Sequence, residues 1–380
     1  MNQNSKTTIL FAGYAPVHFV CFQPLYDVFR ALPGFEVKLS GGLRSEGGAP
    51  GVYKYDLEGL YDPFGIPRDE VVSVEELPGL HFDVGFSSQT NAIHPEVCDR
   101  VVQIFHGISF RNRSIRAENS GYDHYFLVGP YMHRNFVEAG LLEEDDPRAI
   151  RIGFLKTDRL LNGRLDRSAL LAKYGFDGSR PVLLYAPTGQ KGNSMEVMGK
   201  DVIKRLLKED RYDILVKLHD HPKKEIDWPK RLAKFDGPHF KVASDLDVIP
   251  LLHLADLLIT DASSVSSEFS LLDRPMVFLD VPELIERAGR KDGARVDLDT
   301  WGRNCGPVAG TPEEACVEVA RSLASPERFG EVRQAMARDL FYHPGCATEA
   351  ATEWIRKEFG VEEGQVALGA GASGVFNQAD

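Results

Sequence analysis

The chain has 380 residues, of which 43% are hydrophobic and 26% are charged, so it is long enough to bury a large core and to form two or three domains. Its net charge of −12 argues against general affinity for nucleic acid or anionic membrane, so any phosphate site must be a local feature. The five cysteines lie far apart with no Cys-x-x-Cys pair, which favours reduced thiols in a cytosolic protein over a zinc site or a disulfide framework. We expect no signal peptide, and no apolar run approaches the ~20 residues that span a bilayer.

Strand-like and helix-like segments alternate along the whole chain, which predicts an α/β fold with largely parallel sheets. In the first half, the expected strands are residues 8–12, 36–40, 71–74, 83–87, 101–105, 125–128 and 149–152, and the expected helices are residues 19–32 and 131–139. In the second half, the expected strands are residues 182–186, 214–218, 241–243, 257–260 and 276–279, and the expected helices are residues 196–209, 228–235, 248–255 and 265–272.

Turn-forming residues between positions 158 and 179 separate two α/β halves. We predict domains at residues 1–162 and 163–335, C-terminal helices at 336–360 that return to the first domain, and a disordered tail at 361–380 rich in Gly, Ala and Ser. Two such halves place a cleft between them. Ligands of open α/β sheets bind at the carboxyl ends of the strands, so we look for functional residues directly after strands.

The most informative stretch is the apolar strand 257–260 followed by Asp-Ala-Ser-Ser and an apolar-periodic helix. The first N–H groups of a helix have no partner inside it and favour an anion, so Ser263 and Ser264 are expected to hold phosphate. Asp261 holds the loop or contacts ribose, and Glu268 lies one turn on, where a carboxylate would accept from ribose hydroxyls. A Ser-rich helix cap without a ligand is the alternative.

A second post-strand segment contains His106-Gly107, followed closely by Arg111. A histidine at the carboxyl end of a strand can act as a general base near pH 7, and glycine allows close approach of a ligand. Taken alone, a histidine bonded to a loop carbonyl is the better interpretation.

Two further strand exits lie in the second half. Thr188 and Lys191 follow the strand at 182–186, where a hydroxyl and a cation would contact phosphate. Lys217 and His219 alternate onto one face of the next strand's end. His219 and His221 also suggest a metal, but no third ligand is evident, so a cationic phosphate contact is favoured and no metal is predicted. Plain turns or solvated strand ends are the alternatives.

Together these segments resemble the CDP-glycerol glycerophosphotransferase family of teichoic-acid polymerases and primases, over about residues 100–285. The matching segments are His106-Gly107 with Arg111 in a lysine's place, Ala186-Pro187-Thr188, Lys217-Leu218-His219, and Asp261-Ala262-Ser263-Ser264 with Glu268. The chain departs from the family pattern at Phe105 (usually Trp), at Ala262 (usually Tyr), at Gly189-Gln190 (usually Trp-Arg) and at Asp220 (usually Pro).

The resemblance implies a GT-B-like fold with two Rossmann-like domains facing a central cleft. It implies that the N-terminal domain positions an acceptor hydroxyl and that the C-terminal domain binds a CDP-linked nucleotide-diphosphate donor. His106 would be the general base and His219 would stabilise charge on the donor phosphates. The remaining donor-phosphate contacts would come from Thr188, Lys191, Lys217, Ser263, Ser264 and Arg111.

The expected reaction moves a polyol-phosphate group to an acceptor hydroxyl in cell-surface glycopolymer synthesis and releases CMP, with no cofactor. A nucleotide-sugar glycosyltransferase, a non-catalytic nucleotide-binding relative and a nucleotide-sugar epimerase stay open as alternatives. The partners are the donor and a polyol or glycan acceptor, with no nucleic acid. The location is cytoplasmic, with peripheral association at the inner face of the membrane left open. The loop Gly13-Tyr14-Ala15-Pro16 with His18 follows the first strand and either faces the acceptor or starts a helix.

Overall fold

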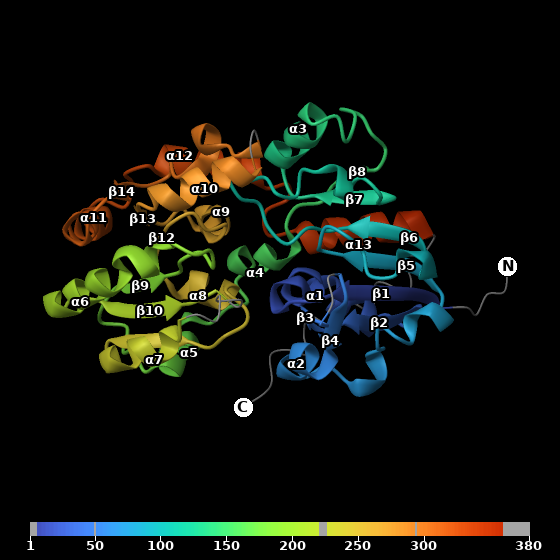
Figure 1. Ribbon diagram of the computed structural model, residues 1–380, viewed down its shortest axis with the longest axis horizontal. Helices are drawn as coiled ribbons and strands as arrows, with labels where there is room; N and C mark the ends of the chain where they lie inside the picture. The colour runs from blue at the N-terminus through green and yellow to red at the C-terminus, as the bar shows by residue number, and fades with distance from the viewer. Residues whose placement is uncertain (1–5, 49–50, 220–225, 293–294, 360–380) are drawn as a thin grey trace. The chain divides into compact units, whose positions relative to one another are not determined.

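The computed structural model describes residues 6–48, 51–219, 226–292 and 295–359. Two compact units alternate along the chain. Unit 1 comprises Met1–His106, Ser114–Asp158 and Phe341–Asp380, and unit 2 comprises Gly107–Arg113 and Arg159–Leu340. Each unit contains a six-stranded sheet whose pairings are all parallel, which confirms the predicted α/β class (Figure 1).

The sheet of unit 1 has the strand order β2-β1-β5-β6-β7-β8. Its strands are β1 (Thr7–Gly13), β2 (Phe35–Gly41), β5 (Phe82–Ser87), β6 (Cys98–Gln103), β7 (His124–Leu127) and β8 (Ala149–Arg151). The central strands are buried on both faces, as the near-continuous apolar sequence of β1 requires. Parallel pairing places the carboxyl ends of β1, β5 and β6 beside one another.

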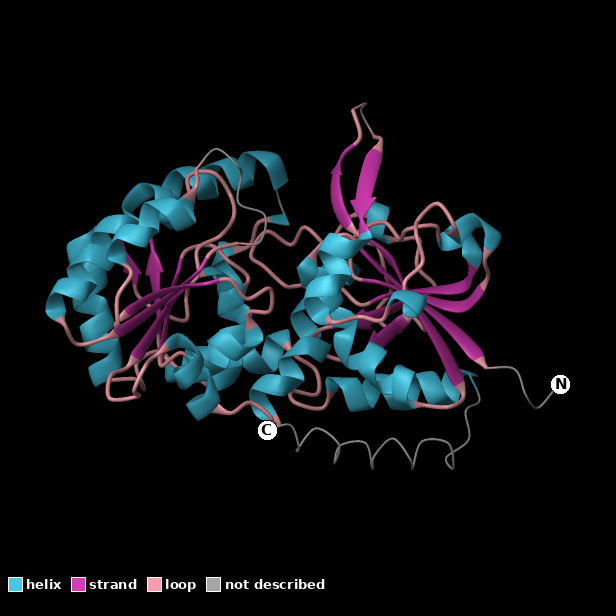
Figure 2. Ribbon diagram, turned by 90° about the horizontal axis from the view of Figure 1, so that it is seen from below, coloured by secondary structure: helices cyan, strands magenta, loops and turns pink. Residues whose placement is uncertain are grey.

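A two-stranded antiparallel hairpin, β3 (Leu43–Glu46) and β4 (Tyr53–Asp56), follows β2 and projects from unit 1 (Figure 2). At its base a Cβ on Gly41 would lie 1.9 Å from the carbonyl oxygen of Gly13, and the φ of Gly41 is +100°. Only glycine fits there, and it lets the hairpin pass directly over the exit of β1. This hairpin was not predicted, because each of its strands has only four residues and β3, Leu-Arg-Ser-Glu, lacks an apolar alternation.

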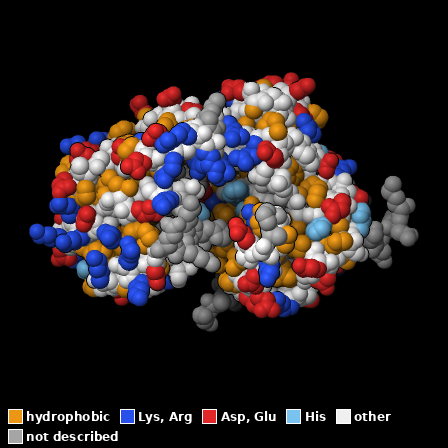
Figure 3. Space-filling view, in the orientation of Figure 1, with side chains coloured by type: hydrophobic (Ala, Val, Ile, Leu, Met, Phe, Trp, Pro, Cys, Tyr) orange, Lys and Arg blue, Asp and Glu red, His pale blue; other side chains and the backbone are white. Residues whose placement is uncertain are grey.

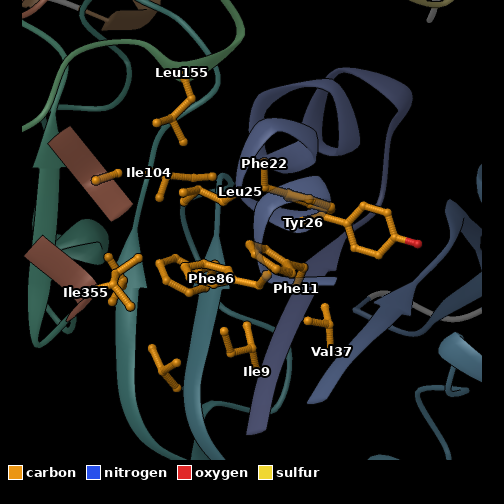
Figure 4. Packing of buried hydrophobic residues seen from close by; sticks show 14 of the residues in the cluster. Ile9, Phe11, Phe22, Leu25, Tyr26, Val37, Phe86, Ile104, Leu155 and Ile355 are labelled. Atoms are coloured by element: carbon orange, nitrogen blue, oxygen red, sulfur yellow. The ribbon is translucent and has the colours of Figure 1, made fainter. Parts of the chain in front are cut away.

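The helices of unit 1 are α1 (Pro16–Ala31), α2 (Leu57–Tyr61), α3 (Pro130–Glu138) and α13 (Ala347–Phe359). Phe22 of α1 stacks on Phe11, which in turn stacks on Phe86, with 5.0 Å between ring centroids in each pair (Figure 4). Ala351 and Ile355 of α13 belong to the same core. The backbone N–H groups of Ala347 and Thr348 donate to the carboxylate of Asp158, which caps α13.

The sheet of unit 2 has the order β11-β10-β9-β12-β13-β14. Its strands are β9 (Val182–Tyr185), β10 (Asp213–Lys217), β11 (Phe240–Ala243), β12 (Leu257–Thr260), β13 (Met276–Leu279) and β14 (Val308–Ala309). Strands β10, β9 and β12 are consecutive neighbours and run parallel. The segments that follow them, which carry the predicted site residues of the second half, therefore lie side by side at one edge of the sheet.

The helices of unit 2 surround this sheet. They are α5 (Arg167–Tyr174), α6 (Lys200–Glu209), α7 (Trp228–Leu232), α8 (Ile249–Leu254), α9 (Val265–Phe269), α10 (Pro282–Asp292), α11 (Pro312–Ala324) and α12 (Gly330–Leu340), while α4 (Asp158–Leu161) spans the join between the units. A π-helical turn, Met195–Gly199, precedes α6. Capping fixes several starts: Asp166 accepts from the first N–H groups of α5, and Thr311 from that of Glu314 in α11.

Most predicted elements are present, with two informative exceptions. The strand expected at residues 71–74 is wrong: Val71 makes one isolated bridge with Leu39, and the chain then turns at Ser73. The helix expected at residues 265–272 is α-helical only for Val265–Phe269 and ends as a 3₁₀ turn, Ser270–Leu272. The predicted disordered tail, residues 361–380, lies outside the described residues, and none of the described helices has the length and apolar character of a membrane span.

Candidate functional site

His106 lies directly beyond β6, and its side chain is exposed. Its Nδ1 is 2.5 Å from the carbonyl oxygen of Ser88, in the segment that follows β5. A carbonyl oxygen only accepts hydrogen bonds, so Nδ1 carries the proton and the lone pair of the neutral imidazole is on Nε2. The predicted alternative, a histidine bonded to a loop carbonyl, is thus present. It is also the arrangement that a general base needs, because the bond fixes the tautomer.

The turn that carries His106 is strained. Phe105 is buried and has a φ of 58°, which is uncommon for a bulky residue. Its N–H donates to Gln103 Oε1 at 2.8 Å. The Gln103 amide nitrogen donates to the carbonyl oxygen of Gln89 at 2.7 Å and to Asn119 Oδ1 at 2.9 Å. The fully buried Gln103 therefore ties together the His106 turn, the segment after β5 and the Asn119 loop.

Sequence reasoning missed Gln103. The available signal was an amide within an otherwise apolar strand end, Val101-Val102-Gln103-Ile104-Phe105. A buried amide must be hydrogen-bonded, so its presence there indicates that the following loops bind to it.

His18, from the loop after β1, packs against His106 with 5.0 Å between ring centroids and 62° between ring planes. The N–H of Tyr14 donates to His18 Nδ1 at 3.1 Å, so the neutral His18 ring carries its proton on Nε2. His18 is 3% exposed. Of the two interpretations of this loop, the start of a helix is confirmed, because Pro16 begins α1. Contact with the acceptor stays a prediction, and His18 is a neighbour of His106.

In unit 2, Asp261 is fully buried at the exit of β12. Its Oδ1 accepts from the N–H groups of Thr188 at 2.9 Å and Ala262 at 2.6 Å. Its Oδ2 accepts from the N–H and the hydroxyl of Ser194 at 2.9 and 2.8 Å. Four internal donors occupy the carboxylate, so the expected ribose contact is replaced by the loop-holding role that was the other expectation for Asp261. It fastens the β9 exit to the β12 exit.

Ser263 and Ser264 are half-buried at this exit. Neither donates its backbone N–H or hydroxyl to an acceptor among residues 6–48, 51–219, 226–292 and 295–359. These groups are available to an anion. The helix dipole adds less than expected, because α9 has only five residues. Glu268 is 2% exposed within α9, and its contact with ribose stays a prediction.

The segment Gly107–Arg113 belongs to unit 2 although it follows His106 in the chain. The Ser267 hydroxyl donates to the carbonyl oxygen of Ile108 at 3.3 Å, and the Asp297 N–H donates to that of Phe110 at 2.7 Å. A Cβ on Gly107 would lie 3.6 Å from Ser264 Oγ. The structure thus brings Arg111 into the unit that holds the Ser263–Ser264 turn, and the peptide after His106 lies at that turn.

His219 and Thr188 lie on neighbouring strand exits. A Cβ on Gly189, the residue after Thr188, would lie only 2.7–3.0 Å from atoms of the His219 side chain. The exposed His219 ring therefore packs on the backbone at Gly189, where the family pattern has Trp. Any side chain at position 189 would displace the imidazole. Residues 220–225, including His221 of the considered metal pair, lie outside the described residues.

Lys217 and Lys191 differ in their surroundings. Lys217 is buried at the end of β10, and its Nζ donates to the carbonyl oxygen of Leu218 at 2.8 Å. Lys191 is exposed, and its carbonyl oxygen accepts from Arg287 of α10 at 2.5 Å. Lys and Arg side chains gather around α10 on the face shown in Figure 3. This local basic surface on a chain of net charge −12 fits a phosphate-bearing ligand.

A known family matches most of this chain. The model of the family "CDP-Glycerol:Poly(glycerophosphate) glycerophosphotransferase" matches residues 100–349. The chain is similar to a teichoic acid glycerol-phosphate primase of Bacillus spizizenii, with 34% identity over 132 residues, which are 34% of this chain and 33% of the relative. It is also similar to a teichoic acid poly(glycerol phosphate) polymerase of Bacillus subtilis, with 27% identity over 225 residues, 57% of this chain and 29% of the relative. The matched segments thus span a third or less of these relatives.

Among solved structures, the wall teichoic acid polymerase TagF, in a substituted form soaked with CDPG, is similar with a TM-score of 0.66 and 17% identity. The similarity covers 96% of this chain and 92% of that one. A UDP-N-acetylglucosamine 2-epimerase follows with a TM-score of 0.58 and 15% identity, over 95% and 98% of the two chains. These similarities confirm the predicted GT-B-like fold.

Proposed function

The chain belongs to the CDP-glycerol:poly(glycerophosphate) glycerophosphotransferase family, and on that premise we propose that it transfers a glycerol-phosphate-like group from a CDP-linked donor to an acceptor hydroxyl and releases CMP. The observation that carries the proposal is the tautomer of His106 that its bond to Ser88 fixes, with the ring proton on Nδ1 and the lone pair on Nε2. The reaction belongs to cell-surface glycopolymer synthesis, at the cytoplasmic side.

His106 Nε2 takes the proton of the acceptor hydroxyl as the oxygen attacks the β-phosphorus of the donor. The new oxygen–phosphorus bond forms while the bond from that phosphorus to the bridging oxygen breaks. CMP leaves with both electrons of that bond as a phosphate dianion, which needs no proton. His106 then returns its proton to solvent. Such transfers depend mainly on positioning and on stabilisation of the phosphate charge.

Groups at the strand exits of unit 2 supply that stabilisation. Lys217, Lys191 and Arg111 provide positive charge, and His219, Thr188, Ser263 and Ser264 donate hydrogen bonds. Asp261 acts through the loops that it fastens: it fixes the Thr188 backbone relative to the β12 exit and is a positioning residue.

The experiment that tests the proposal identifies the nucleotide product. The protein is incubated with CDP-glycerol and a phosphorylated polyol acceptor, and the nucleotides are separated by chromatography. The proposal requires CMP. Release of a nucleoside diphosphate from a nucleotide sugar would instead establish a glycosyltransferase. Nucleotide binding without turnover across a broad acceptor panel would establish the non-catalytic alternative.

Thermal stability in the presence of nucleotides gives an independent reading of the donor. A ligand that binds only the folded state raises the melting temperature. CDP-glycerol and CMP should stabilise the protein. Stabilisation by UDP-sugars and not by cytidine nucleotides would contradict the CDP assignment.

A further inference from the structure

The β3–β4 hairpin carries an exposed arginine, Arg44, whose guanidinium packs on two tyrosine rings. The guanidinium carbon of Arg44 lies 3.7 Å from the centroid of the Tyr14 ring and 4.5 Å from that of the Tyr53 ring. In the antiparallel register Arg44 pairs with Tyr55, and Glu46 pairs with Tyr53. Cross-strand pairs and residues two apart share a face, so Arg44, Tyr53 and Tyr55 lie together on one face of the hairpin.

The backbone holds this group in place. The N–H of Gly42 donates to the carbonyl oxygen of Gly13 at 3.0 Å, and the N–H of Arg44 donates to that of Tyr14 at 3.3 Å. The hairpin base is therefore bonded to the loop after β1. Burial raises the pKa of the Tyr55 hydroxyl, while the charge of Arg44 acts to lower it, as expected for close neighbours.

A row of ring contacts connects this group to the proposed base. Tyr14 packs edge-on against His18 with 4.4 Å between centroids, and His18 packs against His106 at 5.0 Å. All of these residues belong to unit 1. Arg44 is thus separated from His106 by only two intervening side chains.

The charge of Arg44 is not neutralised within the described chain. None of the carboxylates in residues 6–48, 51–219, 226–292 and 295–359 forms an ion pair with it, including Glu46 on the same face. Tyrosine rings on the guanidinium faces leave its N–H groups at the edge, where they form a rigid fork that matches a phosphate. The hydroxyls of the tyrosines add donors beside it.

We propose that Arg44, held by Tyr14, Tyr53 and Tyr55, is a phosphate-binding subsite for a polyol phosphodiester. The tyrosine rings would pack on the carbon skeleton of the polyol, and the guanidinium edge would bind its phosphate. This subsite rests on the proposed function, in which the ligand is the acceptor. One phosphate of the acceptor lies at Arg44 while its terminal hydroxyl reaches His106. A cation–π clamp that only anchors the hairpin is the opposing interpretation.

Calorimetry with glycerophosphoglycerol as the probe, without donor, tests the subsite separately from the transfer reaction. The wild type should bind the probe, and Arg44→Gln should weaken binding at least about tenfold, since hydrogen bonds to charged groups are among the strongest. Arg44→Lys should fall between them, because lysine keeps the charge and loses the fork. Inorganic phosphate should bind more weakly than the diester, because it has no carbon skeleton for the rings.

Lys54→Gln provides the matched control. It makes the same change of charge on the same hairpin, but Lys54 pairs with Ser45 on the opposite face, so binding should not change. Equal weakening by both variants, equal affinity of wild type and Arg44→Gln, or no binding by the wild type would each overturn the subsite. So would equal affinity for phosphate and the diester. A lower melting temperature of Arg44→Gln with unchanged binding would establish the anchoring interpretation. CMP release from CDP-glycerol is measured separately, so the subsite can fail while the transfer reaction stands.

Discussion

In each unit a fully buried polar side chain at the end of a central strand joins the neighbouring loops, and these two side chains differ in charge. Gln103 ends β6 in unit 1, and Asp261 follows β12 in unit 2. Both are fully buried, and each joins loops that carry candidate site residues. Gln103 accepts one hydrogen bond and donates two, whereas Asp261 accepts four.

The difference shows how each unit fixes its loops. An amide both donates and accepts, so Gln103 binds the Phe105 N–H and the Gln89 carbonyl in one network. The network holds the His106 turn beside the segment whose Ser88 carbonyl fixes the tautomer of His106. A carboxylate only accepts hydrogen bonds. Asp261 therefore accepts from donors in the loops after β9 and β12, and these donors are not available to a ligand. Hydrogen bonds to a charged group are stronger than those to a neutral amide. Loss of the buried side chain should therefore destabilise unit 2 more than unit 1.

Removing the carboxylate of unit 2 should have the largest effect. Asp261→Ala leaves the donors of Thr188, Ala262 and Ser194 unsatisfied. The free energy of unfolding should fall by on the order of 4 kcal/mol in urea titrations. Asp280→Ala is the control: Asp280 follows β13, is 34% exposed and, among the described residues, accepts from Val281 and Arg303. It should cost less than about 1.5 kcal/mol. Equal losses would remove the special role of Asp261.

Replacing the amide of unit 1 should cost less. Gln103→Met keeps the length of the side chain without its amide, and it leaves the Phe105 N–H, the Gln89 carbonyl and Asn119 without their partner. We expect a loss of about 2 kcal/mol in unfolding free energy, with a lower rate of CMP release because the His106 turn is no longer held. A rate equal to that of the wild type would show that the network does not position His106.

A substitution at Gly189 should change the rate of transfer without changing the stability of the fold. Gly189→Ala would push the His219 ring away, and since His219 is exposed, stability should change little. Transfer should slow about tenfold, equivalent to about 1.4 kcal/mol. Gly121→Ala is the control, because a Cβ there meets nothing within 4 Å. Loss of activity without any change in His219, read from its imidazole NMR signals, would contradict this account.

The smallest effect concerns one half-buried histidine in each unit, His124 and His253. Burial is the main cause that lowers the pKa of His124, and the pKa of His253 is lowered by burial and by Arg274 and Arg167. The unfolded chain therefore takes up these protons first, so stability is complete above about pH 6.5 and falls as the pH decreases toward the folded pKa values. His124→Phe and His253→Phe should each flatten urea-unfolding stability between pH 7 and 5, whereas His81→Phe, at an exposed position, should not. Unchanged slopes would contradict the assignment.

The sequence predicted the alternation of strands and helices because buried parallel strands are apolar runs, as in β9 and β12. It also located His106, His219 and the Ser263–Ser264 turn, since ligands bind beyond strand ends. Gln103 and the Arg44 group were missed, because both depend on contacts between segments distant in sequence. The same limit explains Asp261: a carboxylate after a strand suggests a ribose ligand until the donors of Ser194 and Thr188 are seen.

The most direct test of the central claim is the rate of CMP release from CDP-glycerol by His106→Ala, measured together with donor affinity. If His106 is the general base, the rate should fall at least ~10²-fold while the dissociation constant of CDP-glycerol stays within about twofold of the wild type. His81→Ala, at an exposed position of the same unit, should retain full activity. A near-normal rate for His106→Ala would exclude His106 from the mechanism and contradict the account.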